Sequence, residues 1–112
     1  MSPPILNRKL TLEAPTRTPD GAGGFTPGWE ARGTLWARIQ PRTGRETGGR
    51  TARISVSGVR ITVRGAPHGH DRRPVADQRL REGDRVYQIL AVTEADPEGR
   101  YLVCDAREET VT

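Results

Sequence analysis

Residues 34–40 have the sequence Thr-Leu-Trp-Ala-Arg-Ile-Gln, in which Leu35, Ala37 and Ile39 occupy every second position. In an extended chain these three side chains share one face, and the residues between them share the other. A period of two is typical of a β-strand with one face buried in a core. The stretch therefore predicts a β-strand with Leu35, Ala37 and Ile39 turned inward.

The same period returns in residues 52–64, but with a change of phase. The apolar positions are Ala52, Ile54 and Val56, followed by Val59, Ile61 and Val63. A shift of one residue turns every side chain of a strand to the other face. We therefore predict a long strand with a β-bulge or a sharp bend near Ser57 and Gly58.

The connection between these two strands, residues 41–50, has the sequence Pro-Arg-Thr-Gly-Arg-Glu-Thr-Gly-Gly-Arg. It contains no apolar side chain that could pack against a core, and its glycines and proline favour a loop. We expect two strands that hold a basic loop out into solvent.

The composition indicates a single domain, residues 1–112, with a thin core. Hydrophobic residues make up only 33% and aromatic residues 4%, so Val, Ile and Leu must supply most of the core. The 13 glycines and 9 prolines favour short strands and turns over helices. Because Cys104 is the one cysteine, no internal disulfide can form, and a reducing, intracellular setting is expected.

The net charge is +4 at pH 7, and Lys9 is the one lysine among many arginines. Arginine binds phosphates and carboxylates through two parallel donors, so the bias is compatible with a nucleic-acid partner. A GC-rich genome would also raise arginine together with alanine, glycine and proline. On composition alone this second explanation is favoured.

The N-terminal part of the chain alternates between expected strand and expected loop. Residues 1–4 are expected to form a loose tail, and residues 7–13 a first strand. Residues 14–28 contain three prolines and four glycines, and they predict a long loop or arm. Phe25 and the adjoining Trp29 are the large apolar side chains of this region. Each could cap the core or anchor a neighbouring subunit.

The connection after the central strands, residues 65–79, contains two histidines and a carboxylate. His68, His70 and Asp71 could begin a metal site, but a closed site needs about four ligands and the sequence offers no further cluster. We expect a solvated loop and no metal. Cys104 lies between apolar neighbours, which indicates a small core residue rather than a nucleophile.

The C-terminal part predicts two more strands. Residues 74–81 could form one helical turn, because proline suits a first helical position. Residues 85–92 predict a strand, apolar on both faces from Ile89 to Val92 and therefore central. A hairpin leads to a last strand, residues 100–105, and residues 106–112 are expected to be a charged tail.

Together these elements predict an all-β fold, a small antiparallel β-barrel of about five to six strands with long loops.

Several classes of function are not supported by any motif. The sequence has no phosphate-binding Gly-rich loop, no nucleophile elbow and no zinc-protease helix motif. We therefore expect that the protein is not an enzyme and has no catalytic residue and no cofactor. No apolar run has the length of a membrane span and the N-terminus lacks a signal-peptide segment, so no membrane partner is expected.

Several pieces of the chain, taken in order, resemble the head–tail joining family of tailed bacteriophages, also called head-completion or stopper proteins. The pieces are residues 6–12, 20–25, 29, 35–41, 44–46, 59–64 and 85–92. The most specific is the strand Trp-Ala-Arg-Ile-Gln-Pro, residues 36–41, followed by Gly-Arg-Glu. The resemblance extends from about Leu6 to Cys104. Residues 65–79 depart from it, since they are longer and richer in histidine and arginine than expected.

The resemblance implies a homo-oligomeric ring, on the order of six or twelve copies, beneath the portal and adaptor proteins of a virion or phage-like particle. Such a ring closes the DNA exit after packaging and docks tail terminator or tail tube proteins. It also implies a position at the head–tail junction, in a phage or a gene transfer agent assembled in the bacterial cytoplasm. The arm, residues 14–28, would lie against a neighbour by adding to the edge of its sheet.

In that family the loop between the two central strands projects into the channel and helps to form the plug, which corresponds here to residues 41–53. The residues concerned are Arg42, Thr43, Gly44, Arg45, Glu46, Gly48, Gly49, Arg50 and Arg53. In a ring, their arginines would hold packaged double-stranded DNA by non-specific phosphate contacts. The alternative is that these arginines form salt bridges with Glu46 or with neighbouring subunits.

A second class of function is a free-standing small β-barrel that binds nucleic acid. Such barrels stack bases on aromatic side chains along a strand face. Here the aromatic residues are scattered over the chain, at Phe25, Trp29, Trp36, Tyr87 and Tyr101.

Overall fold

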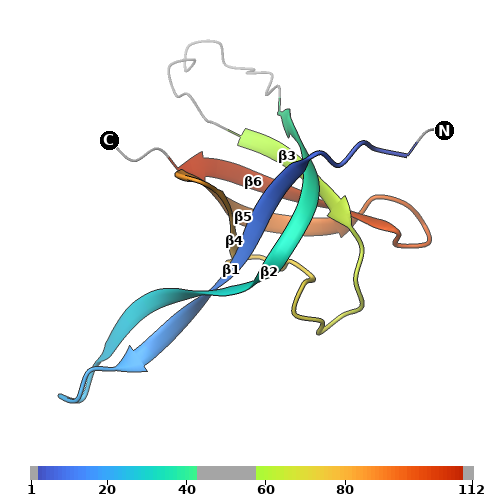
Figure 1. The fold of residues 1–112 in the computed structure, drawn as a ribbon. Coiled ribbons are helices and arrows are strands. Elements are labelled where there is room, and N and C mark those ends of the chain that lie inside the picture. The colour runs from blue at the N-terminus through green and yellow to red at the C-terminus, as the bar shows by residue number, and fades with distance from the viewer. Residues whose placement is uncertain (1–2, 43–57, 110–112) are drawn as a thin grey trace, which may run out of the picture.

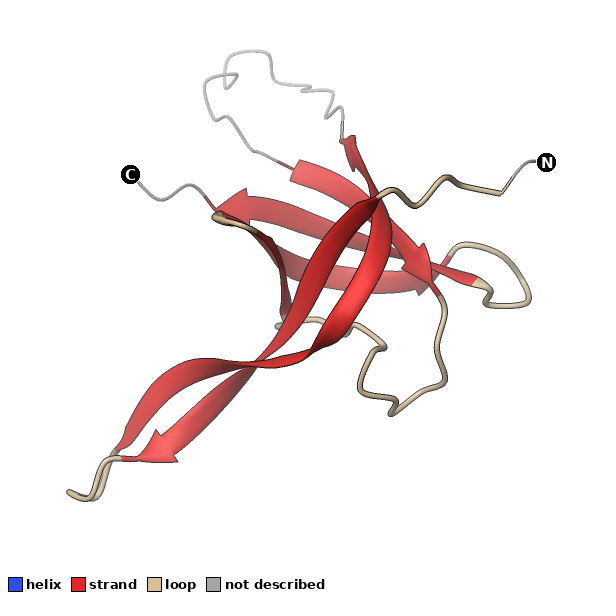
Figure 2. Ribbon diagram, viewed as in Figure 1, coloured by secondary structure: helices blue, strands red, loops and turns tan. Residues whose placement is uncertain are grey.

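Six antiparallel strands form one sheet that closes on itself in the computed structural model, which describes residues 3–42 and 58–109 (Figures 1 and 2). The strands are β1 (Arg8–Pro19), β2 (Phe25–Pro41), β3 (Gly58–Arg64), β4 (Arg79–Glu82), β5 (Arg85–Glu94) and β6 (Tyr101–Glu109). Their order around the closed barrel is β1-β2-β3-β6-β5-β4. This confirms the predicted all-β, antiparallel barrel. No helix in the described part of the chain is long and apolar enough to cross a membrane.

The apolar positions of the two central strands lie inside the barrel, as their alternation predicts. Ala37 of β2 and both Ile61 and Val63 of β3 are fully buried, and Leu35 and Ile39 pack against this core. The two strands pair with Ile39 opposite Ile61, which places their inward side chains next to one another. The part of the predicted second strand that precedes β3, with the bulge expected there, lies outside the described residues.

Val59 of β3 and residues of the other strands complete the core with mainly aliphatic side chains. Its remaining members are Leu10, Leu12, Val59, Leu80, Tyr87, Ile89, Leu102, Cys104 and Ala106. Cys104 is fully buried, which confirms its predicted place in the core.

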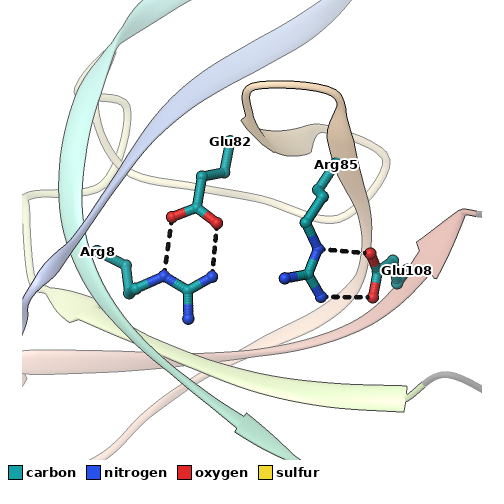
Figure 3. Close-up of polar contacts among 4 residues, drawn as sticks. All are labelled: Arg8, Glu82, Arg85 and Glu108. Atoms are coloured by element: carbon teal, nitrogen blue, oxygen red, sulfur yellow. Dashed lines mark hydrogen bonds and ion pairs between the residues drawn. The ribbon is translucent and has the colours of Figure 1, made fainter.

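The seam between β1 and β4 is the shortest in the barrel, because their pairing runs only from Thr11 opposite Arg81 to Glu13 opposite Arg79. An ion pair flanks it at each end. Arg79 Nε donates to Glu13 Oε1 at 2.6 Å, and Arg8 donates from two nitrogens to the carboxylate of Glu82 (Figure 3). Side-chain contacts thus hold β1 against β4 where the backbone pairing ends.

The substitution Glu82→Gln is therefore expected to lower the free energy of unfolding by about 1 kcal/mol near neutral pH, the upper range for a pair that keeps solvent contact. The hydrogen bond from Arg8 lowers the pKa of Glu82 below its ordinary value of 4.5. Stability from this carboxylate is fully present above the unfolded-state pKa and is lost as pH falls through the folded-state pKa. The difference between wild type and variant should therefore shrink on acidification below that ordinary value. Denaturant unfolding of wild type and variant, once near neutral pH and once below the ordinary pKa of the carboxyl, measures this difference in stability.

Glu98→Gln is the matched control, since Glu98 is exposed and makes no ion pair among the described residues. Its unfolding free energy should equal that of wild type at every pH. A Glu82→Gln variant as stable as this control near neutral pH would show that the seam does not depend on the ion pair.

Residues 14–28 differ from the long loop that the sequence predicted. They belong mostly to β1 and β2, which continue past the barrel as a two-stranded ribbon that projects from it (Figure 1). Only the tip, residues 20–24, is a turn, and Asp20 Oδ1 accepts hydrogen bonds there from the N–H groups of Ala22 and Gly24. We call residues 14–31 the arm.

Three expectations for the C-terminal part are also corrected. The predicted helical turn in residues 74–81 is absent from the described chain, and its last residues form β4. The expected tail from residue 106 continues β6 as far as Glu109. In β5, Leu90 is exposed although the sequence placed it in a strand buried on both faces, because the register with β6 shifts between Ile89 and Ala91.

Candidate functional site

The strand ends that flank residues 43–57 lie at one end of the barrel, and the arm leaves from the other end (Figure 1). Arg42 follows β2 and donates its backbone N–H to the carbonyl of Gly58, the first residue of β3, at 3.0 Å. The turn between β4 and β5 lies at the same end, since β5 begins opposite Glu109, the last residue of β6. We call this the loop-bearing end, after the loop that the sequence predicts in the connection between β2 and β3.

The predicted plug residues can be placed only in part. Arg42 is exposed at the loop-bearing end. The others lie outside the described residues: Thr43, Gly44, Arg45, Glu46, Gly48, Gly49, Arg50 and Arg53. Their role therefore stays a prediction from the sequence.

Two bidentate ion pairs reinforce the loop-bearing end (Figure 3). One is the Arg8–Glu82 pair at the β1–β4 seam, and in the other Arg85 Nε and Nη2 donate to Glu108 at 2.8 and 3.0 Å. The guanidinium of Arg85 lowers the pKa of Glu108 through these hydrogen bonds. The pairs join β1 to β4 and β5 to β6, so four strand ends are fixed at this end of the barrel.

A cluster of arginines covers the outside of β2, β3 and the β5–β6 hairpin. Two adjoining hollows, of about 500 and 260 Å³, share Gln40 and Arg60 in their linings. Arg38 and Arg100 line the larger hollow and Arg42 the smaller. We call Arg38, Arg42, Arg60 and Arg100 the cationic face.

The cationic face has unused capacity for anions. None of its four side chains makes an ion pair with another described residue. Arg38 Nε is buried without a hydrogen-bond partner, which costs about 1–3 kcal/mol for a polar group. Asp96 also lines the larger hollow, but its Oδ1 already accepts the backbone N–H groups of Arg100 and Tyr101. Phosphate or carboxylate groups from outside the chain could bind the exposed guanidinium groups of Arg42, Arg60 and Arg100.

The structure brings Phe25 and Trp29 together on one face of the arm, and neither enters the core. Their exposed fractions are 54% and 40%, so the core-cap alternative is wrong. The guanidinium of Arg17 lies 4.6 Å from the ring centre of Phe25, and that of Arg79 lies 4.0 Å from Trp29. One face of each ring thus lies against a guanidinium, and the rest of each ring remains available for contact.

Two of the possible metal ligands in the loop between β3 and β4 are bonded within the chain. Asp71 pairs with Arg32 at 3.2 Å, and His70 Nδ1 accepts the backbone N–H of Arg72 at 3.0 Å. Among the described residues no group of three or more possible metal ligands occurs. Burial raises the pKa of the Cys104 thiol to about 12, which leaves it protonated and unreactive.

The sequence prediction omitted Arg38, Arg60 and Arg100, although it included their neighbour Arg42. The signal was present, because Arg38 and Arg60 alternate with the inward-facing residues of two strands that were themselves predicted. What the alternation could not give was the register, in which Gln40 lies opposite Arg60 and Arg38 opposite Thr62.

Comparisons with known proteins concern the whole chain. A family described as phage head completion protein matches residues 1–109. A chain in a structure of the virion of a native gene transfer agent particle is 47% identical, with a TM-score of 0.76, and the match covers 98% of this chain and 100% of that one. The solution structure of protein SF1141 from Shigella flexneri 2a is 23% identical, with a TM-score of 0.70 and 96% of each chain covered, and at this identity it supports the fold alone. A search of curated proteins gives no match.

Proposed function

Because this chain belongs to the phage head completion protein family, we propose that it forms a ring below the portal and adaptor proteins of a phage-like particle. There it closes the DNA exit channel and docks the tail terminator or tail tube proteins. The observation that carries this proposal is the family match over residues 1–109, together with 47% identity to a chain of a gene transfer agent virion. The role is structural, without catalysis.

The shape of the protein supports a position between two kinds of neighbour. The arm and the loop-bearing end lie at opposite ends of the barrel, so one copy offers two separate surfaces (Figure 1). A barrel held at its loop-bearing end by bidentate ion pairs gives a firm base for contacts along a channel. The arm is left to contact a neighbouring subunit.

The cationic face gives the proposed channel a means to hold DNA. Its four arginines, which make no ion pairs among the described residues, extend along the barrel from Arg42, beside the strand ends that flank residues 43–57, to Arg100 in the hairpin at the other end of β3. In a ring each copy repeats this charge around one axis. Contacts to phosphates need no base sequence, as expected for the end of packaged DNA. Arg45, Arg50 and Arg53 would add to this charge if the sequence prediction for them holds.

The positions of the aromatic residues disfavour a free-standing barrel that binds single strands. Tyr87 is buried in the core, and Phe25 and Trp29 lie on the arm. Trp36 and Tyr101 are left on different strands that do not pair with each other. A stacking platform needs successive aromatic groups along one strand face, and the described barrel has none.

Removal of the gene from a particle-producing strain tests the proposal. We expect DNA-filled heads that lack tails, counted by electron microscopy, and restoration of joined particles when the wild-type chain is supplied. A chain with Glu98→Gln, altered at an exposed hairpin, should restore them equally. Joined, DNA-transferring particles in the absence of the chain would refute the proposed function.

The amount of DNA that particles of the same strain retain tests the cationic face separately. Arg60→Gln should give joined particles that retain less DNA, with a loss that grows as salt is raised. Arg81→Gln removes the same charge from the exposed side of β4 and should leave retention unchanged. Equal retention by the two variants would remove DNA from the list of partners of this face.

A further inference from the structure

The arm has two unlike faces, because paired residues of an antiparallel ribbon share a face and successive residues alternate. The register pairs Pro15 with Trp29, Arg17 with Pro27 and Pro19 with Phe25. One face therefore carries Pro15, Arg17, Pro19, Phe25, Pro27 and Trp29. The opposite face carries Ala14, Thr16, Thr18, Thr26, Gly28 and Glu30. All the prolines and aromatic residues of the arm lie on the first, which we call the proline–aromatic face.

The backbone of the arm is poorly suited to strand addition, the mode of contact that the family resemblance implied. At the tip, Asp20 donates its N–H to the carbonyl of Gly24, so this pair is hydrogen-bonded across the ribbon. Hydrogen-bonded and non-hydrogen-bonded pairs alternate from there. The nitrogens of Pro15, Pro19 and Pro27 consequently face away from the ribbon, at positions where an added strand would need N–H donors. Proline at such positions blocks edge pairing.

A hollow of about 860 Å³ lies at the base of the arm, between β2 and the loop that follows β3. Leu35, Trp36 and Pro67 supply apolar surface to it, and Trp36 is more than half exposed. Arg64 and Arg72 add positive charge to its lining. It has the volume and the apolar character of a site for aromatic and proline side chains.

The tip of the arm complements this hollow in charge as well as in polarity. Asp20 is exposed, and the hydrogen bonds from Ala22 and Gly24 lower the pKa of its carboxyl, which keeps it ionised. Those bonds use Oδ1, so Oδ2 can accept a hydrogen bond from an arginine. Phe25 lies next to this turn and provides an aromatic anchor.

The tip cannot reach the hollow of its own subunit. Ten residues of extended β2 separate Phe25 from Leu35, a distance of about 33 Å at the usual rise of a strand. Resting on the ring proposed above, we propose that the proline–aromatic face of one copy docks by its side chains in the Trp36 hollow of the next copy, and that Asp20, in the turn at the end of the arm, approaches Arg64 and Arg72 there. Since the two surfaces differ, the contact is heterologous and repeats from copy to copy until the ring closes.

Photo-cross-linking in purified particles tests this contact. Benzoylphenylalanine replaces Phe25, and after irradiation the attached peptide is identified by mass spectrometry. We expect attachment to residues 34–36 or 64–72 of a second copy. Benzoylphenylalanine in place of Thr26, on the opposite face of the arm, is the control and should not give these products.

Each other outcome has a defined meaning. Attachment to a different protein, or no attachment in particles that contain the chain, overturns the inference and leaves the proposed function standing. Absence of the chain from particles that are nevertheless joined refutes the proposed function itself.

Substitutions provide an independent measurement that does not depend on a bulky probe. Phe25→Ala and Trp36→Ala should each lower incorporation into particles about tenfold or more, and the double variant should do no worse than one of them. Thr18→Ala, on the opposite face, should be incorporated normally. Additive losses from the two substitutions would show that Phe25 and Trp36 do not meet.

The prolines separate side-chain docking from strand addition. Pro19→Ala combined with Pro27→Ala restores two outward N–H donors and removes two apolar rings from the proline–aromatic face. Docking by side chains predicts reduced incorporation. Incorporation equal to or above that of wild type would favour strand addition and overturn the inference.

Discussion

A chain without its arm is expected to fold normally and to be lost from particles. In this variant residues 15–29 are replaced by Asn-Gly, which joins Ala14 to its cross-strand partner Glu30 through a two-residue hairpin turn. Ala14 is the one residue of the arm in the buried core, and it is retained. Loss of two aromatic anchors, about 2 kcal/mol each, predicts a fall in incorporation of roughly several hundredfold.

Two measurements on the arm-deleted chain are needed together. Denaturant unfolding should show a midpoint near that of wild type, because a two-stranded ribbon outside the barrel contributes little to the core. Quantification of the chain in purified particles should show its loss. If the arm-deleted chain were incorporated normally, contacts of the arm would have no part in assembly.

The arm also shows where prediction from the sequence was wrong. Strand prediction relies on one buried face, and between Pro15 and Trp29 the ribbon is largely exposed on both faces. Its prolines and glycines therefore indicated a loop. In the structure the nitrogens of the three prolines face away from the partner strand. Their missing N–H groups therefore remove no hydrogen bond between β1 and β2. The same residues that conceal the strands in the sequence protect the edges of the ribbon.

The barrel itself could be predicted because its strands have one buried face. Leu35, Ala37 and Ile39 and the β3 residues Ile61 and Val63 alternate in the sequence as they do around the core. The β4 strand was missed because four residues are too few to show a period. The bulge at Leu90 was missed because an apolar residue at an outward position resembles a buried one in the sequence.

The candidate surfaces were less predictable than the barrel, because they depend on contacts between distant residues. The sequence left open whether Phe25 and Trp29 cap the core or contact a neighbour, and their shared exposed face could be seen only with the register of β1 with β2. Identification of the cationic face required the register of β2 with β3. Pairing registers of this kind are set by the packing of the whole barrel, which no local pattern contains.

The second large effect is expected in the core. Ile61 is fully buried in β3, where it lies opposite Ile39 of β2 and Cys104 of β6. Ile61→Ala should lower the free energy of unfolding by about 3 kcal/mol, since it removes buried methyl groups and leaves a cavity. A small domain has about 5–15 kcal/mol in total, so the variant should lose a large fraction of its stability.

Leu90→Ala is the matched control, because it removes a similar aliphatic group from a side chain that is 50% exposed. Its unfolding midpoint should lie close to that of wild type, with the same dependence on denaturant for all three proteins. The thin core explains the contrast, since its few aliphatic side chains leave no neighbour large enough to fill the space of Ile61. Equal unfolding midpoints for the two variants would mean that the barrel interior is not packed as described.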